Sequence, residues 1–155
     1  MTHRPIPPLP GVLGLLVLSV LAVKGEAHGY EIMKSIEEIT EGKWRPAPGS
    51  LYPLLMSLES EGLIECWSVG EGRVRKVCRL TQEGIRYFIE EVGRRFARIA
   101  PLTIAVLNSL KYLIERERLV NDYYDVIDDI CNYLSKLIRC SSDLCSKASR
   151  TSYAR

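Results

Sequence analysis

One stretch of the chain constrains its fold more than any other. In it, a segment with apolar residues along one face leads directly into two segments with the composition of strands, here called the arms. Its stripe consists of leucines spaced as on one face of a helix: Leu51, Leu54, Leu55 and Leu58. Pro53 is tolerated only in the first turn, where backbone amides have no partner inside the helix, so we place the helix start near Pro48 to Ser50. Ser50 and Tyr52 then share the outward face with the exposed amides, a combination that suits a phosphate.

The two arms that follow predict a hairpin with an uneven charge. Leu63–Val69 and Arg73–Leu80 are rich in β-branched residues, and the glycines flanking Glu71 can adopt the positive φ of a tight loop. The second arm is basic, with Arg73, Arg75, Lys76 and Arg79. Such charges can simply keep an exposed sheet edge from pairing with another strand. Directly after a helix of this kind they better fit a winged helix-turn-helix, whose helix enters the DNA major groove and whose hairpin contacts phosphates.

Linked motifs extend on both sides of this stretch. They are His28-Gly29-Tyr30-Glu31-Ile32, Gly49-Ser50-Leu51-Tyr52-Pro53-Leu54-Leu55, Leu58-Glu59-Ser60-Glu61-Gly62-Leu63-Ile64 and Arg79-Leu80-Thr81-Gln82-Glu83-Gly84. In these motifs, over about residues 11–90, the chain resembles the PadR family of transcriptional regulators. The resemblance implies a dimeric winged-helix DNA-binding protein, usually a repressor that a small effector releases.

Two places depart from the family pattern. After its leucine pair this chain has Met56 and Ser57 where the family often has basic residues, and it has Val77 and Cys78 where the family often has tyrosines. Few side chains on this helix could therefore contact a base or a phosphate. This departure, with a net charge of only +2, supports a second hypothesis: a winged-helix protein-interaction module that has lost DNA binding.

Under the first hypothesis the protein is a sequence-specific regulator that binds an inverted repeat of double-stranded DNA as a homodimer. Its half-sites would lie about one helical turn, roughly 34 Å, apart. Ser50 and Tyr52 would hold phosphates at the helix start, and the wing would add basic contacts. The predicted DNA-binding residues are Tyr30, Arg45, Ser50, Tyr52, Arg73, Arg75 and Lys76.

The fold class that these patterns predict is α+β and mostly α. A flexible proline-rich arm occupies residues 1–10, and the winged helix-turn-helix DNA-binding domain occupies residues 11–100. A helical dimerisation region follows over residues 101–140, and residues 141–155, rich in Ser, Lys and Arg, predict a disordered tail.

Three further helices complete the predicted domain. The first, Val12–Lys24, is apolar nearly all round, and the second, His28–Glu41, buries Ile32, Ile36 and Ile39. Thr81 caps the last helix, and Pro101 ends it. The apolar face of this last helix comprises Ile85, Phe88, Ile89, Val92, Phe96 and Ile99.

The C-terminal third carries a row of apolar residues at heptad spacing: Leu113, Val120, Tyr123, Ile127, Ile130, Leu134 and Leu137. Such a row can pack on its own domain. Since a small winged helix already has a core, we expect the row to bind a second copy instead. The aspartates beside it (Asp122, Asp125, Asp128 and Asp129) have no histidine or glycine loop among them, so we expect a solvated face and not a metal site.

The cysteines form no metal-binding spacing. There are five, at Cys66, Cys78, Cys131, Cys140 and Cys145, none in a Cys-x-x-Cys pair, and the two histidines lie far from them in sequence. We therefore expect no cofactor and free, largely buried thiols in a reducing cytoplasm. The alternative is that Cys66 and Cys78, on opposite arms of the hairpin, face each other.

Other function classes find little support. The apolar run Val12–Val23 is too short to span a bilayer, and the prolines before it argue against a secretory signal, so we expect a cytoplasmic protein without membrane contact. The chain suggests no nucleophile–base pair, which argues against an enzyme. An effector, if there is one, would be small and hydrophobic, with Trp44, Trp67 and several tyrosines as candidate aromatic walls.

Overall fold

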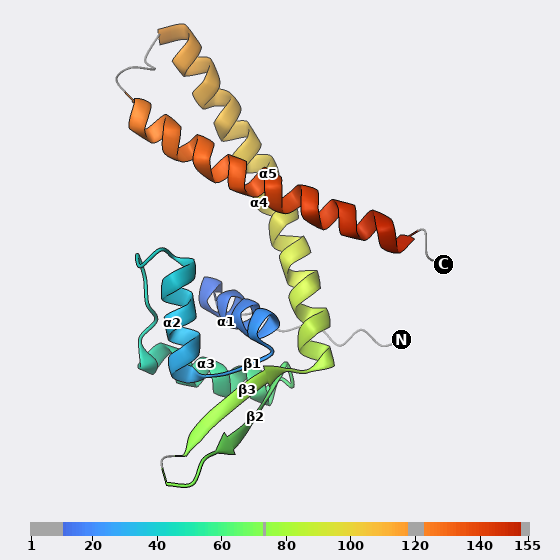
Figure 1. Cartoon of the computed structure of the whole chain (residues 1–155). Helices are drawn as coiled ribbons and strands as arrows, with labels where there is room; N and C mark the ends of the chain where they lie inside the picture. Colours follow the sequence, from blue (N-terminus) through green and yellow to red (C-terminus); the bar gives the residue numbers. More distant parts are fainter. Residues whose placement is uncertain (1–10, 73, 118–122, 153–155) are drawn as a thin grey trace. The chain divides into compact units, whose positions relative to one another are not determined.

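The chain folds into helices and a small antiparallel sheet, as a computed structural model shows (Figure 1). The structure describes residues 11–72, 74–117 and 123–152. Its elements are α1 (Gly11–Lys24), β1 (Glu26–His28), α2 (Gly29–Ile39), α3 (Pro48–Ser60), β2 (Ile64–Val69), β3 (Arg75–Leu80), α4 (Gln82–Glu117) and α5 (Tyr124–Ser152). Two compact units meet in sequence between Arg98 and Ile99. The predicted class, mostly α with a winged sheet, is confirmed.

The sheet has β3 as its central strand, in the order β1-β3-β2. β2 and β3 are the predicted hairpin, and Gly70 and Gly72 in its loop have the positive φ values of 114° and 95° that the tight turn requires. β1 was not predicted, because three residues are too few to show an alternating pattern. Its pairing sets Ala27 opposite Cys78.

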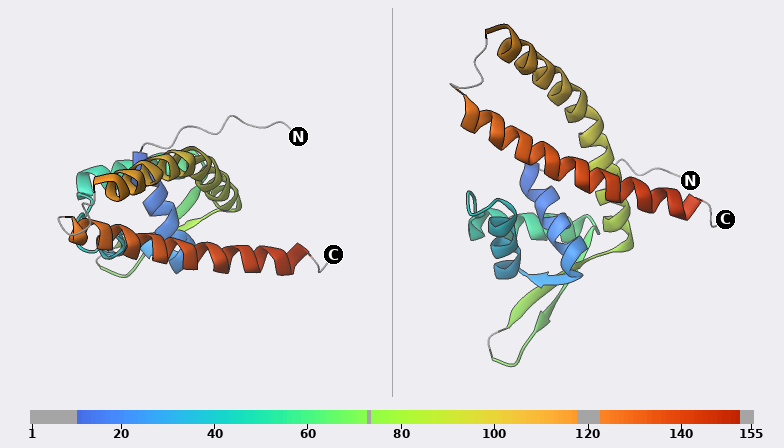
Figure 2. Two further views of the ribbon diagram at one scale, coloured as in Figure 1. Left: turned by 90° about the horizontal axis from the view of Figure 1, so that it is seen from above. Right: turned by 45° about the horizontal axis from the view of Figure 1, so that its top comes forward.

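The core of the N-terminal unit lies between this sheet and the first three helices. Its largest fully buried side chains are Leu18 and Leu21 of α1, Ile32 and Ile36 of α2, Leu51 and Leu58 of α3, and Ile64, Cys78 and Tyr87. All four leucines of the predicted α3 stripe are buried, so the helix has the expected face inward. Figure 2 shows the hairpin extending beyond the helices that pack on its base.

The C-terminal end of α2 differs from the prediction. The helix stops at Ile39, and Glu41 follows with a φ of 55°, so Ile39 lies at the fraying end and is 52% exposed. Met33 takes a place on the buried face instead. The expectation that Ile39 belongs to the inner stripe is therefore wrong.

Thr81 caps α4 as predicted and also ties the helix to the turn after α3. Its hydroxyl accepts the Gly84 amide proton at 3.0 Å and donates to the Gly62 carbonyl at 2.6 Å. The Thr81 amide donates to the Leu63 carbonyl at 3.1 Å. Gly84 approaches that carbonyl so closely that a Cβ there would lie 1.9 Å from the Leu63 oxygen.

The rest of α4 departs from the prediction in two ways. It continues through Pro101 to Glu117, because a proline in a long helix removes one hydrogen bond and bends the helix without having to end it. The helix meets the core through buried Tyr87 and half-buried Phe88, whereas most of the predicted apolar face is exposed. The exposed members are Ile85, Ile89, Val92, Phe96 and Ile99. By length and composition alone, α4 could cross a membrane.

Residues 141–152, predicted as part of a disordered tail, are helical, since α5 continues to Ser152, and residues 153–155 lie outside the described residues. Serine usually disfavours helix interiors because its hydroxyl competes for backbone groups. Here the hydroxyls of Ser141, Ser142 and Ser146 bond carbonyls one turn back, at 2.9 Å each, so the serines are accommodated within the helix.

The thiols do not match the favoured expectation. Cys66 and Cys78 form a disulfide, because the strand register sets them directly opposite with their Cα atoms 4.1 Å apart. The cysteines of α5 are exposed and not buried. The alternative, that the two hairpin cysteines face each other, is confirmed.

We predict that Gly84→Ala lowers the free energy of unfolding by about 1–3 kcal/mol, because its methyl group would overlap a backbone carbonyl that cannot swing away. Urea denaturation followed by circular dichroism measures the change. Gly93→Ala, in the same helix with no atom within 4 Å of the added carbon, is the matched control and should stabilise by about 0.5–1 kcal/mol. Equal stability of the Gly84 variant and the parent would contradict the packing of α4 on Leu63.

Candidate nucleic-acid interface

The outward face of α3 carries small and polar residues and no acid at its centre. Ser50, Tyr52 and Met56 are exposed on it, as predicted. The N-terminus of α3 is a poorer anion-binding site than expected. Pro48 has no N–H, and the Ser50 and Leu51 amides both donate to the Ala47 carbonyl at 3.0 Å. Of the first amides in the helix, only that of Gly49 keeps its proton free for a phosphate.

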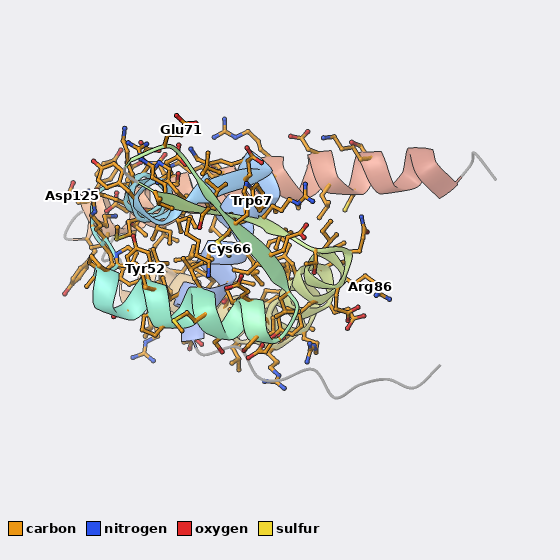
Figure 3. All side chains as sticks on the ribbon, turned by 90° about the horizontal axis from the view of Figure 1, so that it is seen from below. Tyr52, Cys66, Trp67, Glu71, Arg86 and Asp125 are labelled. Carbon is orange, nitrogen blue, oxygen red and sulfur yellow. A yellow bond between two sulfur atoms is a disulfide. The ribbon has the colours of Figure 1, made fainter. Side chains whose placement is uncertain are left out.

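Tyr52 lies against the beginning of α2. A Cβ at Gly29 would lie 2.8 Å from the tyrosine hydroxyl oxygen, so the absence of a side chain there makes room for the ring. The ring is 47% exposed, and its hydroxyl is held close to the N-terminal end of α2. Figure 3 shows Tyr52 on α3 and Trp67 on the hairpin. Tyr52 is thus a positioned surface residue, where the sequence suggested a freely exposed one.

The start of α2 is fixed by a reciprocal cap. The Glu31 amide donates to His28 Nδ1 at 3.4 Å, and the His28 amide donates to the Glu31 carboxylate at 3.0 Å. The sequence motif puts His28 at the helix start but gives no sign of this cap, because histidine is an uncommon N-cap residue.

Tyr30 and Arg45, predicted separately, come together. The Arg45 guanidinium lies 5.1 Å from the centre of the Tyr30 ring and donates to Glu37 Oε2 at 2.9 Å. Its interaction with Tyr30 and, to a lesser degree, with Glu37 raises the pKa of Arg45 above its ordinary value. The aromatic ring and the carboxylate also orient it. The connection between α2 and α3 thus presents one fixed positive charge beside the recognition helix.

The basic residues of β3 have different partners. Lys76 Nζ lies 2.5 Å from Glu59 Oε2 of α3, and Arg79 Nε lies 2.6 Å from Glu65 Oε1 on the paired strand. Arg79 also lies over the Trp67 ring, 5.3 Å from its centre. Arg75 is exposed and makes no ion pair among the residues that the structure describes, and Arg73 lies outside the described residues. Exposed ion pairs are weak, about 0–1 kcal/mol, so Lys76 can exchange Glu59 for a phosphate.

Of the predicted dimerisation residues, Leu113 lies in α4, Tyr123 lies directly before α5, and the others that the structure describes lie in α5. Leu113, Tyr123 and Leu137 are exposed, by 47%, 56% and 59%, and Val120 lies outside the described residues. The other members of the row, Ile127, Ile130 and Leu134, are half-buried. Apolar side chains beside the row are exposed as well: Val126, Tyr133, Ile138 and Leu144.

A metal centre finds no support in the described parts of the chain. No group of three or more His, Cys, Asp or Glu side chains there could hold an ion. Asp125, Asp128 and Asp129 are exposed on α5, and Asp128 accepts a hydrogen bond from Asn132 at 3.1 Å.

Comparison with known proteins agrees with this geometry. The profile of the Transcriptional regulator PadR-like family matches residues 17–90. A PadR family transcriptional regulator from Eggerthella lenta is 34% identical, with a TM-score of 0.50 over 63% of this chain and 79% of that chain. A PadR family transcription regulator from Clostridium difficile is 28% identical, with a TM-score of 0.53 over 63% of this chain and 99% of that chain.

Among curated proteins, the transcriptional regulator YqjI of Escherichia coli is 36% identical over 80 residues. The match covers 52% of this chain and 37% of YqjI, so the chain spans well under two thirds of that relative's length. The residues matched by the family profile, 17–90, include α2, α3 and both strands of the wing. The chain belongs to the PadR family of transcriptional regulators.

Proposed function

We propose that this regulator binds a specific inverted repeat in double-stranded DNA as a homodimer and represses transcription. The observation that carries the proposal is that the wing lies beside α3, where Lys76 of β3 pairs with Glu59 of the helix. Met56 and Tyr52 lie on the helix, and Arg75 stands on the wing without a described ion-pair partner. A helix for the major groove and a cation for the adjacent phosphates are the two parts that such a domain needs.

The electrostatics of this surface are local. The net charge is only +2, and Lys76 covers the one carboxylate of α3 that borders the wing, Glu59. Arg45, in the loop before α3, adds a cation near the N-terminal end of the recognition helix, oriented by Tyr30 and Glu37. With few cations available, we infer that phosphates supply modest affinity and that the DNA sequence is read through apolar, hydroxyl and backbone groups of α3.

The exposed apolar residues of the C-terminal unit support the homodimer. Leu102, Ile104, Val106 and Leu113 of α4 are each at least 47% exposed, as are Tyr123 and Leu137 near and on α5. A soluble monomer rarely leaves so much apolar surface in water. A second copy would cover it and would hold two recognition helices at the spacing of an inverted repeat. We therefore place the protein in the cytoplasm, with a partner chain and not lipid over α4.

We further infer a small hydrophobic effector, bound where the dimer buries aromatic side chains. The candidate walls are Tyr112, Tyr123, Tyr124 and Tyr133, all at least 46% exposed in the single chain. Trp67 is a poorer candidate than the sequence suggested, because it lies under Arg79 on the wing.

The alternative, a protein-interaction module without DNA binding, retains the support of Met56 and Ser57 in place of basic residues. A gel shift with DNA from the protein's own promoter region, against scrambled DNA of the same length, separates the two. The proposal requires a shift of the promoter DNA at a protein concentration that leaves the scrambled DNA unbound. No preference at any salt concentration would favour the interaction module.

We predict that Arg75→Ala weakens binding to promoter and scrambled DNA alike and lowers the salt slope by about one unit, because it removes one phosphate contact. Fluorescence anisotropy over a range of salt concentrations measures both effects. Arg79→Ala is the matched control from the same strand. It should change the slope less, since Arg79 lies at the core end of β3, away from the hairpin loop, and is oriented by both Glu65 and the Trp67 ring. Equal slopes for the Arg75 variant and the parent would remove the wing from the interface.

We also predict that Tyr52→Phe weakens operator binding several-fold while the melting temperature stays within a degree or so of the parent's. Phenylalanine keeps the ring that fills the space over Gly29 and removes only the hydroxyl that would donate to DNA. Unchanged operator affinity would show that the tyrosine is there for packing alone.

For assembly, we predict that Leu137→Glu converts a dimer into a monomer, because it places a charge in the apolar row that a second copy would cover. Light scattering should give twice the 17.5 kDa chain mass for the parent and the chain mass for the variant. Ser135→Glu, exposed on the same helix outside the row, should remain dimeric. A dimeric Leu137 variant would contradict this use of the row.

A further inference from the structure

The disulfide lies between the core end of the wing and its hairpin loop. Cys66 and Cys78 are a register pair of β2 and β3, and three pairs lie beyond them toward the hairpin loop. Those pairs are Trp67↔Val77, Ser68↔Lys76 and Val69↔Arg75. The bond therefore separates the strand ends that join the core from the segment that carries Arg75 and Lys76.

The segment beyond the bond is held weakly by the rest of the protein. Ser68, Val69, Arg75 and Lys76 are exposed, and Lys76 links this segment to α3 through an exposed ion pair with Glu59. Figure 1 shows the hairpin tip standing away from the helices, and Figure 3 marks its loop at Glu71. A two-stranded ribbon without a covered face is only marginally stable in water. The covalent link at its base thus restricts how far the tip can splay.

The two sulfur atoms differ in their surroundings. Cys78 is 1% exposed and belongs to the core, whereas Cys66 is half-buried at the edge of the core. Cys66 is thus the more exposed of the two residues, and we expect a reductant to attack there. In addition, a regulator works where the DNA is, and disulfides in that compartment are commonly redox-sensing, except in hyperthermophiles, where structural ones are frequent.

We propose that Cys66–Cys78 is a thiol–disulfide exchange site through which a dithiol reductant controls the DNA affinity of the wing. This inference rests on the proposed DNA-binding function. The oxidised protein binds DNA more tightly than the reduced protein, because its basic side chains are held in place before binding.

The exchange with a dithiol proceeds in two steps. A thiolate of the reductant attacks Cys66 Sγ and forms a mixed disulfide, the bond to Cys78 breaks, and its electron pair goes to Cys78 Sγ, which takes up a proton in its apolar surroundings. The second thiolate of the reductant then attacks its own sulfur in the mixed disulfide and releases Cys66, which is protonated in turn. The dithiol is oxidised to a disulfide, and the two cysteines gain two electrons and two protons.

The first experiment counts thiols in the full chain. Protein purified without reductant and alkylated in denaturant should carry label on three of its five cysteines, and on all five after treatment of the folded protein with dithiothreitol. Circular dichroism should show that the treated protein stays folded. Five labels before treatment would mean that the bond does not form, and three labels after it would mean that the bond is purely structural. Either result would overturn the inference.

The second experiment measures binding to promoter DNA by fluorescence anisotropy before and after dithiothreitol. The reduced form should bind on the order of tenfold more weakly, with a salt slope lower by about one unit, since the tip cations must be ordered on binding. Equal binding by both forms, or tighter binding by the reduced one, would overturn the inference and leave the proposed function intact. If neither form prefers promoter DNA, the proposed function fails and this inference with it.

Two variants assign the response to the wing. A Cys131→Ser, Cys140→Ser, Cys145→Ser protein should respond to dithiothreitol as the parent does, and loss of the response would refer it to α5 instead. Cys66→Ala with Cys78→Ala should bind like the reduced parent and ignore the reductant. Because Cys78 is a core residue, Cys66→Ala alone serves if the double variant does not fold, and it should give the same result.

Discussion

The burial of Cys78 in the central strand is the constraint on which the rest of the N-terminal unit depends. With Ala27 opposite on one side and Cys66 on the other, it fixes the register of all three strands against the core. Strand side chains alternate, so this register decides that Lys76 lies on the face toward α3 and that Arg75 and Arg79 lie on the opposite face. A shift by one residue would bury a charge and expose the disulfide. The side chains on the inner face of the wing therefore fix the register of its strands.

From that register follows the uneven use of charge in the wing. Arg79 lies between Glu65 and Trp67, Lys76 covers Glu59, and Arg75 is left for an outside partner. A count of basic residues would treat the three alike. Only Arg75 combines exposure with the absence of a carboxylate partner in the described residues. For a protein of net charge +2, the few cations in suitable places set how strongly salt acts on DNA binding.

The apolar surface has a similar division of roles. In the N-terminal unit the helices bury what their sequences mark as apolar, and Tyr87 completes the core from α4. Farther along α4 and on α5, apolar side chains stay in water in the single chain. The homodimer proposed above would use this surface, because such an interface leaves the recognition helix open. Two copies would also give the small winged helix more contact with DNA.

The sequence by itself determined the features that act within one or two turns of the chain: the start and inner face of α3, the glycine loop of the hairpin and the Thr81 cap of α4. Motifs of this kind also sufficed for the family. The tertiary structure decided what depends on partners far apart in sequence. These are the three-residue strand β1, the Cys66–Cys78 bond, the pairing of Arg45 with Tyr30 and Glu37, and the neutralisation of Arg79. Pro101 and Ile39 show the same limit, because a helix end depends on the packing around it as well as on local propensity. Periodicity and caps are local interactions, whereas register and ion pairs are settled only when the strands meet.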